Sequence, residues 1–110
     1  MAGTYVLDRS KNGKYKFNLR AANHKVILTS ELYESKDRAS AGIESVRKNG
    51  GSDARYERKS AKDGSAYFVL KATNGQVIGT SEMYASTDSM EKGIASVKKH
   101  ASDAKVSDRT

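Results

Sequence analysis

Alternating apolar and polar residues predict three β-strands in the first half of the chain. The clearest alternation runs through residues 15–21, where apolar side chains fall on one face and Lys16, Asn18 and Arg20 on the other. Shorter runs with the same two-residue period precede and follow it, separated by turn residues. The strands predicted on this pattern span residues 5–9, 15–21 and 25–30.

After these strands the apolar period lengthens to that of an α-helix. Ile43 and Val46 recur at helical spacing, and Ser35 stands where a helix N-cap belongs. Asp37 falls in the first turn, where a negative charge suits the helix dipole. We therefore predict one helix after Ser35 and, from the same signals, a second helix after Ser86.

The two predicted helices belong to two copies of one pattern, offset by 51 residues. Of 46 consecutive residue pairs at this spacing, 20 are identical without a gap. TSELY at 29–33, for example, returns as TSEMY at 80–84. We predict a single compact domain made of repeat one, residues 1–51, and repeat two, residues 52–110.

Duplication predicts how the apolar surface is buried. A unit of about 50 residues without disulfide or metal buries too little surface to be stable alone. A further strand signal follows each helix, so each half is predicted to be a β(3)-α-β repeat. We expect an α+β fold in which the repeats share one antiparallel sheet, with both helices packed on one face. Because the second copy supplies the partner, we expect a monomer.

Several glycines predict details of the turns, of the helix–sheet packing and of the core. Asn74-Gly75 predicts a hairpin turn with positive φ at both central residues, and His24 in the matching position is interpreted as a turn residue. Gly42 and its equivalent Gly93 interrupt the helices, which predicts a close approach of helix to sheet. Gly79 stands where repeat one has a leucine, Leu28, and is expected to cost one core contact.

The net charge of +7 favours anionic partners such as nucleic acid, an acidic protein or a membrane surface, although it also suits a merely soluble protein. The chain has no cysteine and two isolated histidines, so we expect no metal and no cofactor. It has no apolar segment of signal-peptide or membrane-spanning length, so we expect a cytoplasmic location and no membrane association.

The repeated TSExY segment has two interpretations. In the first, it sets the corner between strand and helix through Thr and Ser hydrogen bonds. In the second, the two copies form symmetric pockets, with Glu31 and Glu82 as acceptors and Tyr33 and Tyr84 as stacking platforms. No nucleophile–base pair or phosphate loop accompanies them, so we expect no enzyme activity. Glu31 and Glu82 would act as a carboxylate pair only if the symmetry axis brought them close.

A nucleic-acid-binding surface is the alternative function. If the helices cover one face of the sheet, the other presents basic side chains and one aromatic. An apolar outward residue such as Val69 would instead mark a protein-interaction surface if it joined a larger exposed patch. The residues predicted for the nucleic-acid surface are Lys16, Asn18, Arg20, Tyr67 and Lys71.

Three motifs that each occur twice carry a family resemblance: F-x-L-[RK]-A-x-N, T-S-E-[LM]-Y and G-I-x-S-V. With these motifs in order over nearly its whole length, the chain resembles the YegP-like family of small bacterial tandem-repeat proteins. The resemblance implies β(3)-α-β units in one sheet with C-terminal strands exchanged between repeats, and it implies no assigned activity. We therefore expect a non-catalytic module that binds an unknown protein or small ligand.

Overall fold

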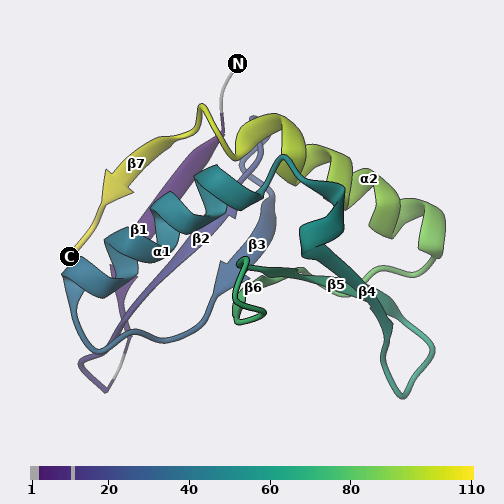
Figure 1. The fold of residues 1–110 in the computed structure, drawn as a ribbon, viewed down its shortest axis with the longest axis horizontal. Coiled ribbons are helices and arrows are strands. Elements are labelled where there is room, and N and C mark those ends of the chain that lie inside the picture. The colour runs from purple at the N-terminus through teal and green to yellow at the C-terminus, as the bar shows by residue number, and fades with distance from the viewer. Residues whose placement is uncertain (1–2, 11) are drawn as a thin grey trace.

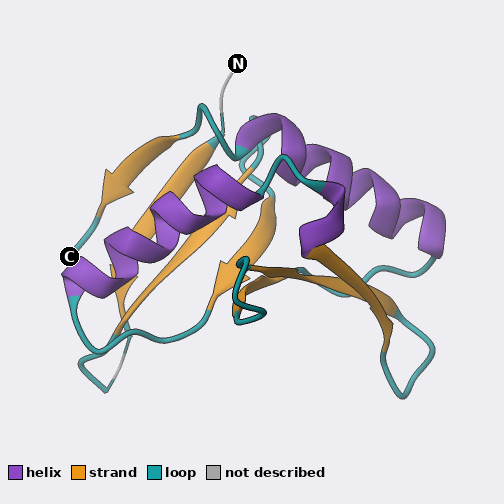
Figure 2. Ribbon diagram, viewed as in Figure 1, coloured by secondary structure: helices purple, strands orange, loops and turns teal. Residues whose placement is uncertain are grey.

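The computed structural model describes residues 3–10 and 12–110. A layer of strands carries two helices on one side (Figure 1; Figure 2). In chain order the elements are β1 (Thr4–Arg9), β2 (Tyr15–Arg20), β3 (Val26–Ser30), α1 (Lys36–Asn49), the 3-10 helix η1 (Asp53–Arg55), β4 (Tyr56–Ser60), β5 (Ala66–Lys71), β6 (Val77–Thr80), α2 (Thr87–His100) and β7 (Lys105–Asp108).

All seven of these strands form one sheet in the order β4-β5-β6-β3-β2-β1-β7. The pairs are antiparallel except for β7, which runs parallel to β1. The expectation of a wholly antiparallel sheet is therefore wrong at this edge. Helix α2 carries the chain from β6, near the middle of the sheet, to the outer side of β1, where β7 enters in the same direction as β1.

The hydrophobic core lies between the sheet and the two helices. Ile43, Val46, Ile94 and Val97 are fully buried, as their helical spacing predicts. Phe17 and its equivalent in β5 lie at the centre of the sheet side, because alternate strand residues face the helices. The fully buried large side chains are Tyr5, Leu7, Phe17, Leu19, Leu28, Ile43, Val46, Phe68, Leu70, Ile94 and Val97.

The two repeats meet across β3 and β6 with a pseudo-twofold relation. Thr29 pairs with Thr80, its own equivalent at a spacing of 51, so the axis passes between these two residues. The register irregularity after Leu19 in β2 returns after Leu70 in β5. Equivalent strands thus pair in equivalent registers on both sides of the axis.

Leu28 and Gly79 break this symmetry beside the axis. A Cβ atom added to Gly79 would lie 2.7 Å from Leu28 Cγ and 2.8 Å from Leu28 Cδ2. The leucine thus fills the space that a side chain on Gly79 would need, and two leucines do not fit. Gly79 therefore makes room for a core contact, which corrects the expectation that it loses one.

Two buried tyrosines join each repeat to the helix of the other. Tyr5 donates a hydrogen bond to the carbonyl of Ala101, at the end of α2. Tyr56 donates to the carbonyl of Gly50, at the end of α1, over 2.6 Å. Burial raises the pKa of both phenols, so they remain donors. These reciprocal bonds satisfy carbonyls that helix termini leave without an intrahelical partner.

The β2–β3 and β5–β6 hairpins differ from the predicted turn. The Ala21 N–H donates to Lys25 O over 2.9 Å and the His24 N–H donates to Ala21 O over 2.8 Å, which leaves three residues in the loop. Only the last of the three, His24 in one hairpin and Gly75 in the other, has a positive φ, of 69° and 86°. This is a three-residue hairpin with one left-handed position, in place of a two-residue turn with two. The interpretation of His24 as a turn residue is confirmed.

Candidate twin binding grooves

The serines of the two TSExY segments hold neighbouring strands. The Ser30 hydroxyl accepts the Phe17 N–H at 2.9 Å and donates to the Glu31 carbonyl at 2.8 Å. Ser81 makes the same pair of bonds with the Phe68 N–H and the Glu82 carbonyl, at 3.0 and 2.8 Å. The hydroxyl thus replaces a ladder bond where the strand ends, which supports the structural interpretation of the segment.

The tyrosines of these segments reach the middle of the helices. Tyr33 exchanges backbone hydrogen bonds with Tyr15, and its ring stacks on Phe17 with centroids 6.1 Å apart. Its hydroxyl lies where a Cβ on Gly42 would be, and Tyr84 stands in the same relation to Gly93. The helix glycines are therefore required by tyrosine side chains and, at Gly42, also by the Phe17 ring of β2, so the predicted close approach to the sheet is found there.

Beside each of these tyrosines the surface is hollowed into a groove between a helix and a hairpin. The α1 groove has a volume of about 560 Å³ and the α2 groove about 390 Å³. The α1 groove is lined by Glu31, Tyr33, Arg38, Ala41, Gly42, Ser45, Ala72, Asn74, Gln76, Val77 and Ile78. The α2 groove is lined by Ala21, Asn23, Lys25, Ile27, Tyr84, Ser89, Lys92, Gly93 and Ser96.

The two grooves are equivalent and each is built from both repeats. All nine residues of the α2 groove lie 51 positions from a residue of the α1 groove. In the α1 groove the helix and tyrosine come from repeat one and the hairpin from repeat two; in the α2 groove the contributions are exchanged. The second interpretation of TSExY, symmetric pockets containing the tyrosines, thus also has a geometric basis.

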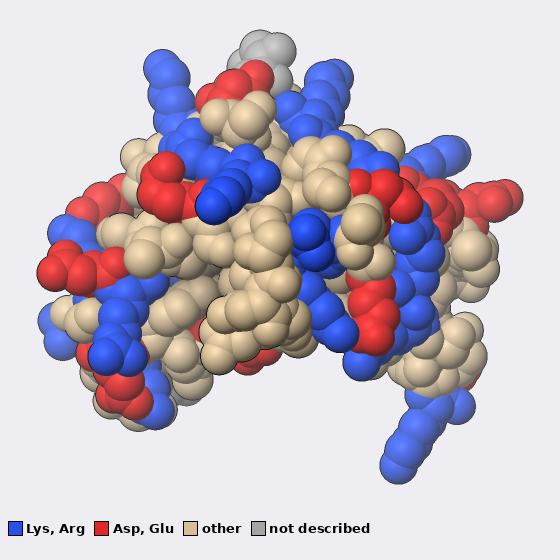
Figure 3. Space-filling model, in the orientation of Figure 1, with Lys and Arg blue, Asp and Glu red and all other residues tan. Residues whose placement is uncertain are grey.

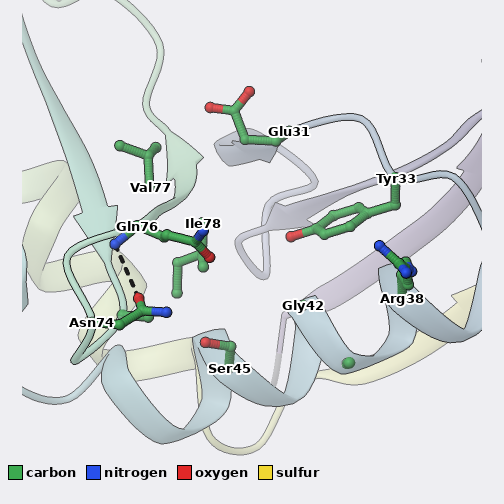
Figure 4. Close-up of a pocket in the computed structure, with 11 residues that line it drawn as sticks. Glu31, Tyr33, Arg38, Gly42, Ser45, Asn74, Gln76, Val77 and Ile78 are labelled. Atoms are coloured by element: carbon green, nitrogen blue, oxygen red, sulfur yellow. Dashed lines mark hydrogen bonds between the residues drawn. The ribbon is translucent and has the colours of Figure 1, made fainter.

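Hydrogen-bonding groups surround the α1 groove. Figure 4 shows the Tyr33 hydroxyl pointing into it, with Ser45 on the helix below and Asn74 on the opposite hairpin. The Asn74 side-chain oxygen accepts the Gln76 N–H at 3.0 Å, so the amide nitrogen is the group of this side chain that is left for other contacts. Within the described part of the chain the Tyr33 hydroxyl has no protein partner, so it too is available for binding.

Burial and a nearby carboxylate keep these phenols protonated. Burial raises the pKa of Tyr33, and the negative charge of Glu31 raises it further. Burial and Glu82 raise the pKa of Tyr84 in the same order. Each groove therefore presents a phenol O–H as a donor at neutral pH.

The grooves differ in charge. Arg38 and Glu31 line the α1 groove with one charge of each sign. Lys25 and Lys92 line the α2 groove, where no carboxylate is among the lining residues that the structure describes. The tyrosine, serine, asparagine, isoleucine and glycine positions are identical, so the two sites share their neutral donors and differ in electrostatic preference.

Glu31 and Glu82 do not form a carboxylate pair. They follow Thr29 and Thr80 on antiparallel strands and so diverge from the axis in opposite directions. The offset amounts to four residue steps, or about 13 Å along the strands. Paired carboxylates of glycoside hydrolases lie within about 10 Å of each other. Each glutamate instead lies near the tyrosine of its own segment, Glu31 near Tyr33 and Glu82 near Tyr84.

The residues predicted for nucleic-acid binding lie on the sheet face away from the helices, in two groups. Arg20 Nε donates to Asn18 Oδ1 at 3.1 Å on β2, where Lys16 is opposite Asp8 of β1. On β5, Lys71 Nζ lies 2.9 Å from a Glu57 carboxylate oxygen.

Acidic neighbours therefore reduce the positive charge of this face. Tyr67 is half-buried beside the Lys71 group. Val69 is only 5% exposed, so it contributes to no apolar patch. On the helix side, basic and acidic side chains are interspersed (Figure 3).

Sequence reasoning found the tyrosines but missed the residues opposite them. Ser45 and Ser96 are identical at the repeat spacing, as are Asn23 and Asn74, and this identity was the available signal. The pattern could not show that the hairpin of one repeat lies opposite the helix of the other.

Among residues 3–10 and 12–110 there is no cluster of potential metal ligands, and no helix is long and apolar enough to cross a membrane.

Comparisons with known proteins match the whole chain. The family model "Domain of unknown function (DUF1508)" matches twice, over residues 10–57 and 61–108. A UPF0339 protein of Bordetella pertussis is 56% identical over 110 residues, covering 100% of this chain and 98% of the relative. UPF0339 protein YegP of Escherichia coli K12 is 50% identical over 110 residues, covering 100% of both.

Two solution NMR structures have the same fold. YegP from E. coli, described as a protein of unknown function, has a TM-score of 0.95 at 50% identity, covering 100% of this chain and 95% of that one. A UPF0339 protein from Shewanella oneidensis has a TM-score of 0.92 at 48% identity, covering 98% and 92%. The expected resemblance is confirmed: this chain belongs to the UPF0339 family of YegP-like proteins, built from two DUF1508 repeats and uncharacterised in function.

Proposed function

We propose that this protein is a non-catalytic module that binds a small ligand in the twin grooves. The observation that supports this most is that equivalent residues of the two repeats line both grooves, although each groove is assembled across the repeats. Tyr33 and Tyr84 serve two purposes in this proposal: their rings pack on the core and their hydroxyls face the ligand.

The chemistry of the grooves points to a small molecule with an apolar body and an anionic group. Ile78 and Gly42 give the α1 groove an apolar floor, while Tyr33 and Ser45 supply hydroxyls. Arg38 adds a cation there, and the α2 groove has two lysines in its lining. A volume of a few hundred cubic ångström suits a ligand of roughly drug size. We expect tighter binding of anions in the α2 groove, which lacks a counterpart of Glu31 in its lining.

Amide chemical shifts measured by NMR test this proposal. We would titrate the protein with a set of small aromatic and aliphatic carboxylates and follow residues of both grooves. The variant Tyr33→Phe with Ser45→Ala removes two donors from the α1 groove alone. Binding there should weaken about tenfold while the α2 groove, as an internal control, is unchanged. Shifts that cluster outside both grooves, or that ignore the double substitution, would refute the proposal.

Nucleic acid remains a second candidate because Lys16, Arg20 and Lys71 share the face away from the helices. The pairing of Lys71 with Glu57 predicts weak, strongly salt-dependent binding. Titration of labelled single-stranded DNA and RNA at two salt concentrations tests it, with Lys16→Glu plus Lys71→Glu as the matched variant. An absence of binding at low salt would remove this candidate.

We further propose that the chain is a monomer that folds as a covalent pseudo-dimer with its C-terminal strand exchanged between the repeats. β7 follows α2 of repeat two but pairs with β1 of repeat one, so it completes the half-sheet of the other repeat. β4 follows α1 but belongs to repeat two and pairs with β5 of the same repeat, so it is not exchanged. Sedimentation over a hundredfold concentration range should give one mass, that of a single chain. A dimer at the lowest concentration would contradict this proposal.

A further inference from the structure

The two edges of the sheet are equivalent by sequence but end differently. β1 lies inside the sheet because β7 pairs with its outer side, whereas β4, its equivalent in repeat two, is the last strand in the order. The edges lie at opposite ends of the molecule (Figure 1). Within the described chain, nothing occupies on β4 the position that β7 occupies on β1.

The contacts of β7 define what such a position requires. The Lys105 N–H donates to the Gly3 carbonyl over 3.3 Å, and the Arg109 N–H donates to the Leu7 carbonyl over 2.8 Å. Asp108 forms an ion pair with Lys36, the first residue of α1. Backbone hydrogen bonds to β1 and its preceding residue therefore hold both ends of β7. At its C-terminal end an acidic side chain also pairs with a cation at the start of α1.

On β4, one of the two ends of this arrangement is blocked and the other is free to accept a strand. The equivalent of Gly3 is Ala54, which lies in η1, and the Tyr56 N–H is already bonded to the Asp53 carbonyl. That end is closed. The equivalent of Leu7 is Arg58, and because both strands have the same register, its carbonyl points away from β5 toward the free edge.

A hollow lies at this open half. It has a volume of about 230 Å³ and lies between β4 and the first turns of α2. Its position matches the place where Asp108 and Arg109 lie on the other edge. The residues that line it are Arg58, Lys59, Ser60, Ala66, Thr87 and Met90.

We propose that the open half of the β4 edge binds an extended acidic peptide segment of a partner protein, added parallel to β4 as β7 is added to β1. The segment has an acidic residue at the position of Asp108, beside Thr87, and its next amide N–H donates to the Arg58 carbonyl. Strand addition of this kind draws affinity from main-chain bonds and specificity from side-chain positions.

The charges around the hollow support an acidic partner. Arg58 and Lys59 line it, and the N-terminus of α2 has its positive dipole end there. Arg58 is also bonded to Glu91 and Asp53, so it acts as an oriented part of the wall. Lys59 lies 3.6 Å from Glu57, a looser pair. With a chain charge of +7, long-range attraction also favours an acidic segment.

A second copy of this chain that inserted its own β7 would be a poorer occupant. That β7 would first have to leave β1, which vacates one position for each one filled. The exchange would gain no hydrogen bonds. A segment of a different protein carries no such penalty, so the free edge remains available to it.

NMR titration with the acetylated and amidated hexapeptide EVSDRE tests the proposal on the intact protein; the peptide keeps the sequence of residues 106–109 and has glutamate at both ends, so that the segment is acidic. We expect weak binding, with amide shifts at Arg58, Lys59, Ser60 and Thr87. A peptide N-methylated at its arginine cannot donate to the Arg58 carbonyl and should bind about tenfold more weakly. A peptide with asparagine in place of aspartate should bind about threefold more weakly.

The variant Thr87→Lys serves as a gain-of-function control, because it copies the cation that Lys36 supplies on the other edge. It should bind the aspartate peptide about threefold more tightly and leave the asparagine peptide unchanged. Equal affinity of the N-methylated peptide, shifts confined to the twin grooves, or no shift at millimolar peptide would overturn the proposal. A concentration-dependent dimer with β4 at its interface would show a second copy to be the occupant instead.

Discussion

At the centre of the sheet, Leu28 of repeat one and Gly79 of repeat two hold equivalent positions and compete for one space. Farther out, Tyr33 and Tyr84 also hold equivalent positions, yet both keep their large side chains, each against its own helix glycine. The difference follows from distance to the pseudo-twofold axis. Next to the axis two equivalent side chains meet each other, so only one is large; away from it each finds a separate place.

The same comparison extends to charge and to the sheet edges. Lys92 replaces Ala41 in the otherwise similar grooves, and Thr87 replaces Lys36 beside the sheet edge that has no β7. Away from the axis, core positions such as Tyr5 and Tyr56 or Phe17 and Phe68 are kept in both repeats, whereas these solvent-facing positions diverge. Binding properties of the two halves are therefore free to differ while the packing remains common.

The largest predicted change in stability comes from substitutions that remove the difference between Leu28 and Gly79 beside the axis. Gly79→Leu places a second leucine against Leu28 and should lower the free energy of unfolding by about 3 kcal/mol. Leu28→Gly should cost about 4 kcal/mol through the cavity it leaves. The exchanged double variant should recover most of both losses, because one leucine again fills the space. Urea denaturation of the three variants measures this, and additive losses in the double variant would contradict it.

The next prediction concerns the reciprocal tyrosines. Tyr5→Phe and Tyr56→Phe each remove the donor to a buried helix-end carbonyl, of Ala101 and of Gly50. Each should lower the free energy of unfolding by about 1.5 kcal/mol. Because the bonds are equivalent, the two losses should agree closely in thermal or urea unfolding. A loss confined to one of them would show that the repeats do not depend on each other equally.

Smaller effects should separate the two helix glycines. The three atoms nearest to a Cβ on Gly93 all belong to Tyr84, whereas those nearest to a Cβ on Gly42 include a Phe17 ring carbon at 2.9 Å besides Tyr33. The mobile end of a tyrosine can yield, but the buried Phe17 ring cannot. After the gain in helix propensity of about 1 kcal/mol, we expect Gly42→Ala to be the more destabilising by about 1 kcal/mol. Equal stabilities of the two variants would contradict this.

The smallest predicted effect is the pH dependence of an ionic cluster near the β4 edge. Hydrogen bonds from Lys98 and Arg58 lower the pKa of Asp53 from 3.8 to about 2. A carboxyl with a lowered pKa in the folded state stabilises the fold above its unfolded pKa and loses that contribution as pH falls. The urea midpoint of wild type should therefore exceed that of Asp53→Asn above about pH 4. The two should converge toward about pH 2, and a constant difference would contradict the cause given.

Local sequence patterns determined the repeat, the strand and helix order, the Ser35 and Ser86 caps and the buried helix residues. These features depend on residues close together in the chain, through alternation, helical spacing and side-chain capping. The parallel direction of β7, the crossed construction of the grooves and the role of Gly79 depend on which segments meet after the chain has turned back. Such meetings are set by the packing of the two helices on one shared sheet, so only the tertiary structure decided them.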